Sequence, residues 1–238
     1  MDIFDQYAEK ITAQLKNNTL LKLPQSGGLW PETEKNPFIM ERETAVELGG
    51  YPKESINLMI SSSNFDFVEK DGLWLIGDPK ALYGKDKHLS FGKVVLLKCK
   101  DVNSEETYDY LKSVEFSDMR QHFFDVMVRM STQKQFTNLR ISKKAMKKGF
   151  TIDRLGWSML QSFLALPQVE QVKIILILGD SPLYKELLPV AEKIRDVTSA
   201  LNTMFDGIDF DCQSCKLNGI CEEVEGLKKV HKASRSMV

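Results

Sequence analysis

Apolar residues recur at the spacing of an α-helix in several segments of the chain. In residues 2–17 the apolar side chains fall about one turn apart, which predicts an amphipathic helix. Similar spacing predicts helices over 104–113, 117–132 and 153–166. Ser142 can cap a short helix over 143–148 that Gly149 closes, and Pro182 can begin a long helix that reaches Phe205.

Other segments carry strand patterns. The apolar runs in 93–102, 136–142 and 172–178 predict buried strands, and 43–52 fits a strand or a short helix. Alternation around Asp71–Gly72 predicts a β-hairpin over 64–78.

Strands that alternate with helices predict an α+β or α/β fold, in which helices flank a mixed sheet and a small Cys-rich, metal-binding tail follows. We expect an N-terminal α+β region over 1–134 and an α/β region over 135–238 that ends in the cysteines, or one continuous domain.

The charge balance excludes two classes of partner. The chain has 32 Lys and Arg against 33 Asp and Glu among 238 residues, for a formal net charge of −1. Such a balance gives no overall attraction to nucleic acid or to an anionic membrane. The longest apolar run, 172–178, is too short to span a bilayer, and the acidic start is unlike a signal peptide. We therefore expect a cytoplasmic protein.

Three of the four cysteines lie within ten residues of one another: Cys212, Cys215 and Cys221. Two thiolates at the Cys-x-x-Cys spacing can reach one zinc ion or iron–sulfur cluster, and disulfides are rare in a reducing cytoplasm. A complete site needs a fourth ligand, for which Cys99, His231 and Asp211 are candidates. The sequence leaves three roles open: a structural metal, a redox-active or catalytic centre, and free thiols.

Six cations gather in fifteen residues of the second half: Arg140, Lys143, Lys144, Lys147, Lys148 and Arg154. Such a cluster is typical of a solvated surface, and it also fits a site for an anion, such as a phosphate of coenzyme A or an acidic partner. The chain lacks the G-x-x-x-x-G-K-[ST], G-x-G-x-x-G and G-x-S-x-G motifs of phosphate loops, dinucleotide sites and hydrolases.

Three segments resemble the acetyl-CoA synthase family, the β-type subunit of the carbon monoxide dehydrogenase/acetyl-CoA synthase complex. They are "VELGG" (46–50), "LRISKKAMKKGFTIDRLGWSML" (139–160) and "MFDGIDFDCQSCKLNGICEEVEGLKKVHK" (204–232). The resemblance implies an accessory protein of anaerobic one-carbon metabolism that binds a corrinoid protein or another synthase subunit, handles coenzyme A, and carries an iron–sulfur cluster or zinc.

The sequence departs from that family at its nickel site. The family binds nickel through a Cys-x-Cys pair and uses a larger cysteine set, whereas this chain has four cysteines and no Cys-x-Cys. The resemblance therefore implies a domain that does not make acetyl-CoA alone. Two alternatives stay open, a stand-alone enzyme of methyl or acyl transfer and a structural module whose metal only stabilises the fold.

Overall fold

The apolar strand β9 (Val169–Leu178) is the central strand of a five-stranded sheet in the computed structural model, which describes residues 4–63, 68–99, 104–205 and 219–220. The order of this sheet is β1 (Leu21–Leu23), β4 (Gly72–Ile76), β9, β6 (Phe91–Cys99) and β3 (Ser55–Ser62). β4 and β9 are parallel, as are β6 and β3, whereas β1–β4 and β9–β6 are antiparallel. The sheet is therefore mixed, with β3 at one edge.

A second, four-stranded sheet packs against part of the first. Its order is β5 (His88–Leu89), β2 (Thr44–Gly49), β8 (Phe136–Ser142) and β7 (Val126–Ser131). β2 and β7 both pair antiparallel with β8, and β5 pairs parallel with β2. Because Thr44 of β2 lies opposite Ser142 of β8, the segment before β2 comes close to the segment after β8.

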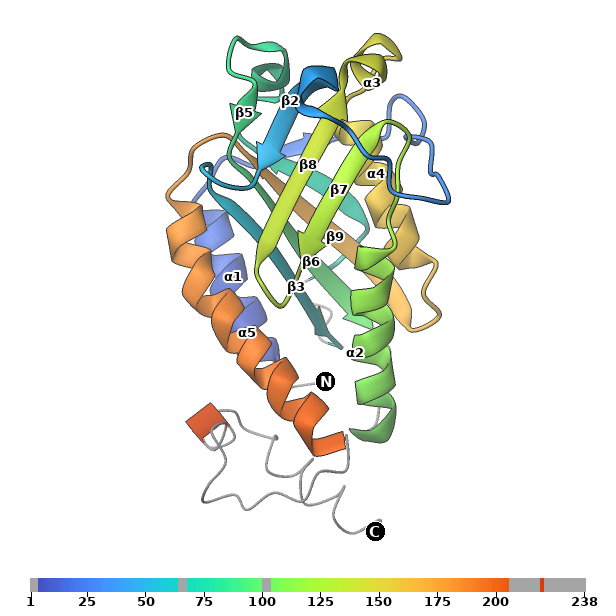
Figure 1. Ribbon diagram of the computed structural model, residues 1–238. Helices are drawn as coiled ribbons and strands as arrows, with labels where there is room; N and C mark the ends of the chain where they lie inside the picture. Colours follow the sequence, from blue (N-terminus) through green and yellow to red (C-terminus); the bar gives the residue numbers. More distant parts are fainter. Residues whose placement is uncertain (1–3, 64–67, 100–103, 206–218, 221–238) are drawn as a thin grey trace.

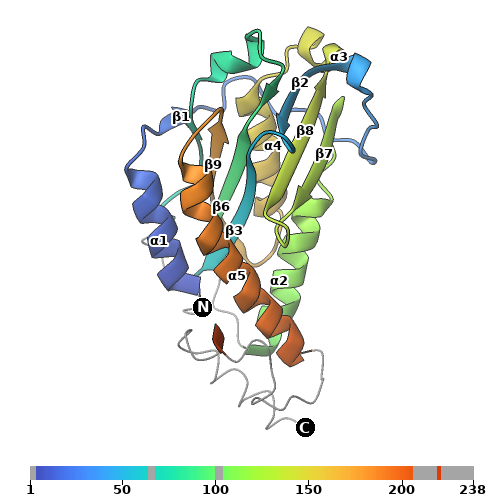
Figure 2. The same ribbon diagram turned by 60° about the vertical axis from the view of Figure 1, so that its left-hand side comes forward.

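Helices cover both faces of the five-stranded sheet (Figures 1 and 2). α1 (Asp5–Lys16) and α5 (Leu183–Phe205) cover one face, while α4 (Ile152–Leu164), α2 (Ser104–Met119) and the second sheet lie on the other. The short helix α3 (Lys143–Lys147) follows β8, and two 3-10 turns, η2 (Glu41–Glu43) and η3 (Pro79–Tyr83), complete the described part. No helix in these described ranges has both the length and the apolar character needed to cross a membrane.

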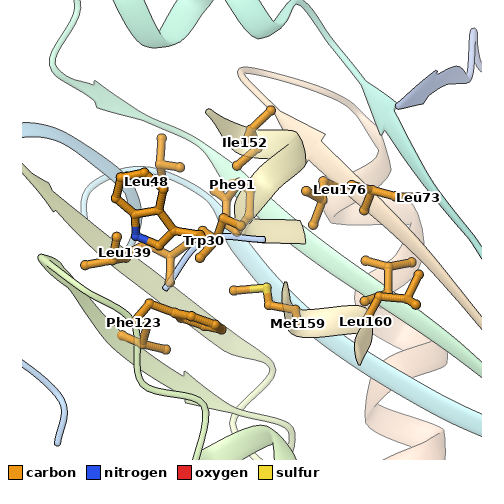
Figure 3. Packing of buried hydrophobic residues seen from close by; sticks show 14 of the residues in the cluster. Trp30, Leu48, Leu73, Phe91, Phe123, Leu139, Ile152, Met159, Leu160 and Leu176 are labelled. Atoms are coloured by element: carbon orange, nitrogen blue, oxygen red, sulfur yellow. The ribbon is translucent and has the colours of Figure 1, made fainter. Parts of the chain in front are cut away.

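Two apolar cores lie on the two faces of the five-stranded sheet. The larger fills the space between the two sheets and α4, where Trp30, Phe91 and Met159 meet (Figure 3). The smaller lies under α1 and α5 around Ile11, Ile177 and Leu187. Each fully buried aliphatic or aromatic side chain of this kind stabilises the fold by about 1.5–3 kcal/mol relative to an exposed one.

The structure confirms the α+β class and corrects two element predictions. The helix predicted over 117–132 is wrong, because α2 ends at Met119 and residues 126–131 form β7, whose hydrogen-bonding partner is β8. The hairpin predicted over 64–78 is also wrong for its described part, because residues 68–70 form no strand and β4 pairs with β1 on one edge and with β9 on the other; residues 64–67 lie outside the described residues.

Each of the two sheets contains strands from both predicted regions, 1–134 and 135–238. β9 lies between β4 and β6, and β8 lies between β2 and β7. The predicted Cys-rich tail lies outside the described residues.

Candidate functional site

The basic segment of the sequence lies at the end of β8 that is far from the β7–β8 turn. The Ser142 hydroxyl oxygen accepts hydrogen bonds from the backbone N–H groups of Lys144 (3.1 Å) and Ala145 (2.9 Å) and so caps α3. Ala145 is fully buried and anchors the helix to the core. The lysines of α3 are therefore held on a fixed turn at one end of the second sheet (Figure 1).

A pocket with a volume of about 470 Å³ opens between α3 and the segment before β2. We call it the basic pocket. Its charged lining residues are four cations and two carboxylates, namely Arg42, Lys143, Lys144, Lys147, Glu43 and Asp125. The ring of Phe38, which is 77% exposed, adds an apolar wall. The lining thus carries an excess of positive charge beside an exposed aromatic ring.

Some of these charges already have partners. Lys144 Nζ lies 3.4 Å from Asp125 Oδ2, and Lys143 Nζ donates to the backbone carbonyl of Arg42 at 2.8 Å. Arg42 and Lys147 form no ion pair with any other described residue. Lys143 forms no ion pair there either, but its ammonium is held by the Arg42 carbonyl. Among the described residues, the guanidinium of Arg42 and the ammonium of Lys147 are therefore the pocket cations held by neither a carboxylate nor a carbonyl, and they are the most available to an anion.

The structure separates the six predicted cations into two groups. Lys143, Lys144 and Lys147 line the basic pocket, and Lys148 lies next to it with its Nζ 3.9 Å from the centre of the Phe124 ring. Arg140 and Arg154 do not line it.

Both arginines hold other parts of the fold together. Arg140 Nε lies 3.1 Å from Glu47 Oε2 across the β2–β8 pair. Arg154 donates to the carbonyls of Gly149 (3.1 Å) and Leu29 (3.3 Å) and lies over the Trp30 ring. These contacts give the two arginines structural roles.

Arg42 is a pocket residue that the sequence reasoning missed. It lies in η2, about a hundred positions before α3, and no periodicity in the sequence connects the two segments. The antiparallel register of Thr44 with Ser142 brings them together. Only knowledge of the β2–β8 pairing could have identified Arg42 in advance.

A buried ion pair is a second polar feature that the sequence reasoning missed. The ammonium of Lys93 on β6 donates to Asp118 Oδ1 at the end of α2, and the two side chains are 0% and 2% exposed. Asn57 on β3 donates its Nδ2 to the other oxygen of Asp118 at 2.9 Å. The sequence signal that could have indicated this pair is Lys93 within the apolar strand β6, because a buried lysine needs a charged partner.

Of the cysteines predicted to bind a metal, Cys99 alone lies within the described residues. Cys99 ends β6, is 2% exposed, and places its Sγ 3.5 Å from the carbonyl oxygen of Ser62. Cys212, Cys215 and Cys221 lie outside the described residues, as do the alternative ligands Asp211 and His231. Among the residues that the structure does describe, no three His, Cys, Asp or Glu side chains form a group that could hold a metal ion.

Comparison with known proteins adds no family to this description. No protein-family model matches the chain, and no curated protein matches it significantly.

Proposed function

We propose that this chain is a binding protein that recognises a phosphate-bearing ligand in the basic pocket. The observation that carries the proposal is the meeting of Arg42 with Lys143, Lys144 and Lys147 around one pocket of about 470 Å³. That volume falls within the range of roughly 300–1,000 Å³ common for small-molecule sites. A guanidinium and several ammonium groups are the side chains best suited to phosphate oxygens.

The resemblance to acetyl-CoA synthase supports coenzyme A as the ligand. Coenzyme A carries several phosphate charges and an adenine ring, and the basic pocket offers unpaired cations beside the exposed ring of Phe38. On this proposal the chain is a cytoplasmic accessory protein of anaerobic one-carbon metabolism. Its protein partner is a corrinoid protein or a synthase subunit.

The same resemblance supports a metal in the C-terminal segment. We propose that Cys212, Cys215 and Cys221 bind an iron–sulfur cluster or zinc, with Cys99, His231 or Asp211 as the candidates for the fourth ligand. Anaerobically prepared protein should then contain iron or zinc in proportion to the chain, and Cys215→Ser should lower that content. Metal-free protein from such a preparation would refute this part of the proposal.

Calorimetric titration with coenzyme A tests the basic pocket. The double variant Arg42→Gln/Lys147→Gln removes the two unpaired cations, so we expect its affinity to fall at least about tenfold, as the loss of two charge-assisted hydrogen bonds implies. Pantetheine, which lacks the phosphates, should bind more weakly than coenzyme A to the unchanged protein. Raising the salt concentration should weaken coenzyme A binding, because the pocket is open to solvent.

Lys134→Gln is the control at a distant position. Lys134 lies at the β7–β8 turn, at the other end of the second sheet, and its replacement removes one positive charge, half of what the double variant removes, without altering the basic pocket. Its affinity for coenzyme A should equal that of the unchanged protein. If Lys134→Gln costs half as much binding free energy as the double variant does, the attraction is a general charge effect and the proposed site is wrong.

A further inference from the structure

A narrow cavity beside β3 lies apart from the basic pocket and shares no lining residue with it. The five consecutive residues from Asn57 to Ser61 all line it. Because consecutive side chains of a strand point to opposite faces, a cavity that touches all five follows the edge of the strand. β3 is one of the two edge strands of its sheet, and within the described ranges β6 is its one strand partner. We call this space the strand-edge cavity.

The strand-edge cavity is long and narrow. Its strand wall from Asn57 to Ser61 covers about 13 Å at the rise of a β-strand. Its helix wall is one face of α5 from Ala191 to Asn202, which covers about 16 Å at the rise of an α-helix. Figure 1 shows β3 between α5 and α2. Val114 and Glu115 of α2 form the wall opposite α5. The volume is about 80 Å³, and one water needs roughly 10–15 Å³. This volume therefore suits a chain of several atoms in single file.

Two buried polar atoms of the cavity lining lack partners. Asn57 and Ser61 are 1% and 4% exposed, and neither Asn57 Oδ1 nor Ser61 Oγ has a hydrogen-bond partner among the described residues. The orientation of the Asn57 amide is fixed by Asp118, whose ionised carboxylate can only accept, so the amide nitrogen faces Asp118 and the carbonyl oxygen is left free. A buried carbonyl without a donor is costly, and a ligand that donates to it removes that cost.

The lining between these two atoms is apolar and its charges are balanced. Met59 lies between Asn57 and Ser61 on the same face of β3, and Leu97, Val114 and Ile194 add apolar surface. The charged lining residues are Glu115 and Arg195, which have opposite signs.

Both of these charged groups already have a hydrogen-bond partner. Glu115 accepts a hydrogen bond from the Thr132 hydroxyl at 3.2 Å, and Arg195 pairs with Asp196 at 2.8 Å. An anionic ligand would therefore lose hydration without gaining an unpaired cation, and the zero net charge of the lining does not favour a cationic ligand over a neutral one.

We propose that the strand-edge cavity binds a linear, uncharged molecule with a hydrogen-bonding group at each end and an apolar chain between them. One end donates to Asn57 Oδ1, the other end bonds to the Ser61 hydroxyl, and the chain lies along Met59. This site is independent of the proposed phosphate site, so either can fail without the other.

Methyl NMR of the full chain tests the proposal with three probes that share a six-carbon chain. Hexanediol with a hydroxyl at each end should give saturable shifts of the Val114 and Ile194 methyl signals. Hexanol, with one hydroxyl, should bind roughly twofold to tenfold more weakly, which is the range expected for one hydrogen bond. The dimethyl ether of the diol has no donor and should bind more weakly still.

Ser61→Ala and Ser55→Ala form a matched pair of variants. Both serines lie on the same face of β3, but Ser55 is outside the cavity. Ser61→Ala should abolish the advantage of the diol over hexanol, and Ser55→Ala should preserve it. Equal affinity of the unchanged protein for all three probes would overturn the proposal in favour of simple apolar partitioning. The absence of saturable shifts would overturn it in favour of a cavity that holds only water.

Discussion

At the scale of single residues, the pair of Lys93 and Asp118 shows how one interior contact constrains several elements. Lys93 comes from β6, Asp118 from the end of α2, and Asn57 from β3. The Lys93 ammonium also lies 5.7 Å from the centre of the Phe163 ring of α4. The buried Asp118 carboxylate and the buried Lys93 ammonium each depend on the opposite charge of the other.

Removal of one member of this pair should therefore be costly. We expect Asp118→Ala to lower the free energy of unfolding by about 3–5 kcal/mol, because it leaves the Lys93 ammonium buried without a counter-charge. Urea denaturation measures this loss. The double variant Lys93→Met/Asp118→Leu should lose less than the single variant, since no lone charge remains. An equal or larger loss in the double variant would contradict this explanation.

Lys173 provides a test of pH dependence. Burial lowers the pKa of its ammonium below the usual 10.5; the carboxylate of Glu69 opposes this effect and the charge of Lys16 adds to it. Between the folded and unfolded pKa values the unfolded chain binds more protons, so stability rises as the pH rises through that window. The stability of Lys173→Met relative to the unchanged protein should therefore fall as the pH is raised from 7 towards 10.5. If urea denaturation shows a constant difference in unfolding free energy between the two proteins over this range, burial does not shift the pKa of Lys173.

At the scale of elements, sequence patterns were reliable where one face of a segment meets the core. β8 (Phe136–Ser142) has the bounds that its pattern predicts, and α1 and α4 differ from their predicted ranges by a few residues. α5 continues from Leu183 to Phe205 with Pro189 inside it. In each of these elements the apolar residues repeat at the period of the observed structure.

The errors arose where tertiary pairing decides the structure. Residues 126–131 have apolar side chains that fit a helix when extended back to residue 117, but the β7–β8 ladder makes them a strand. β3 was not predicted, since Asn57 and Ser61 interrupt its apolar pattern. The same limit applies to the basic pocket, because its lysines form a visible run whereas Arg42 joins them only through the β2–β8 register.

Gly49 at the end of β2 tests how closely β2 and β8 approach each other within the second sheet. Its φ is +68°, and a Cβ atom there would lie 2.2 Å from the carbonyl oxygen of Thr137. Gly28 has a similar φ of +71° but nothing within 4 Å of the added atom. Gly28→Ala should cost about 1–2 kcal/mol of backbone strain alone. Gly49→Ala should lower the thermal unfolding midpoint clearly more than Gly28→Ala does. Equal decreases of the two midpoints in calorimetry would show that the close approach to Thr137 is unimportant.

At the scale of the whole molecule, the architecture separates the two candidate sites. The basic pocket lies between α3 and the segment before β2, and the strand-edge cavity lies between β3, α5 and α2. The second sheet carries the basic pocket on its α3 end, whereas the β7–β8 turn at its other end reaches the strand-edge cavity through Thr132 and Gln133. A ligand at one site can therefore be distinguished from a ligand at the other by which residues respond.

A backbone-amide NMR titration of the intact chain with coenzyme A tests most directly whether the basic pocket binds phosphate. We expect saturable shifts concentrated in the residues around the basic pocket, at 38–43 and 142–147, with little change at the strand-edge cavity. Shifts that do not saturate, or that concentrate away from these two segments, would contradict the assignment of the basic pocket as a phosphate-binding site.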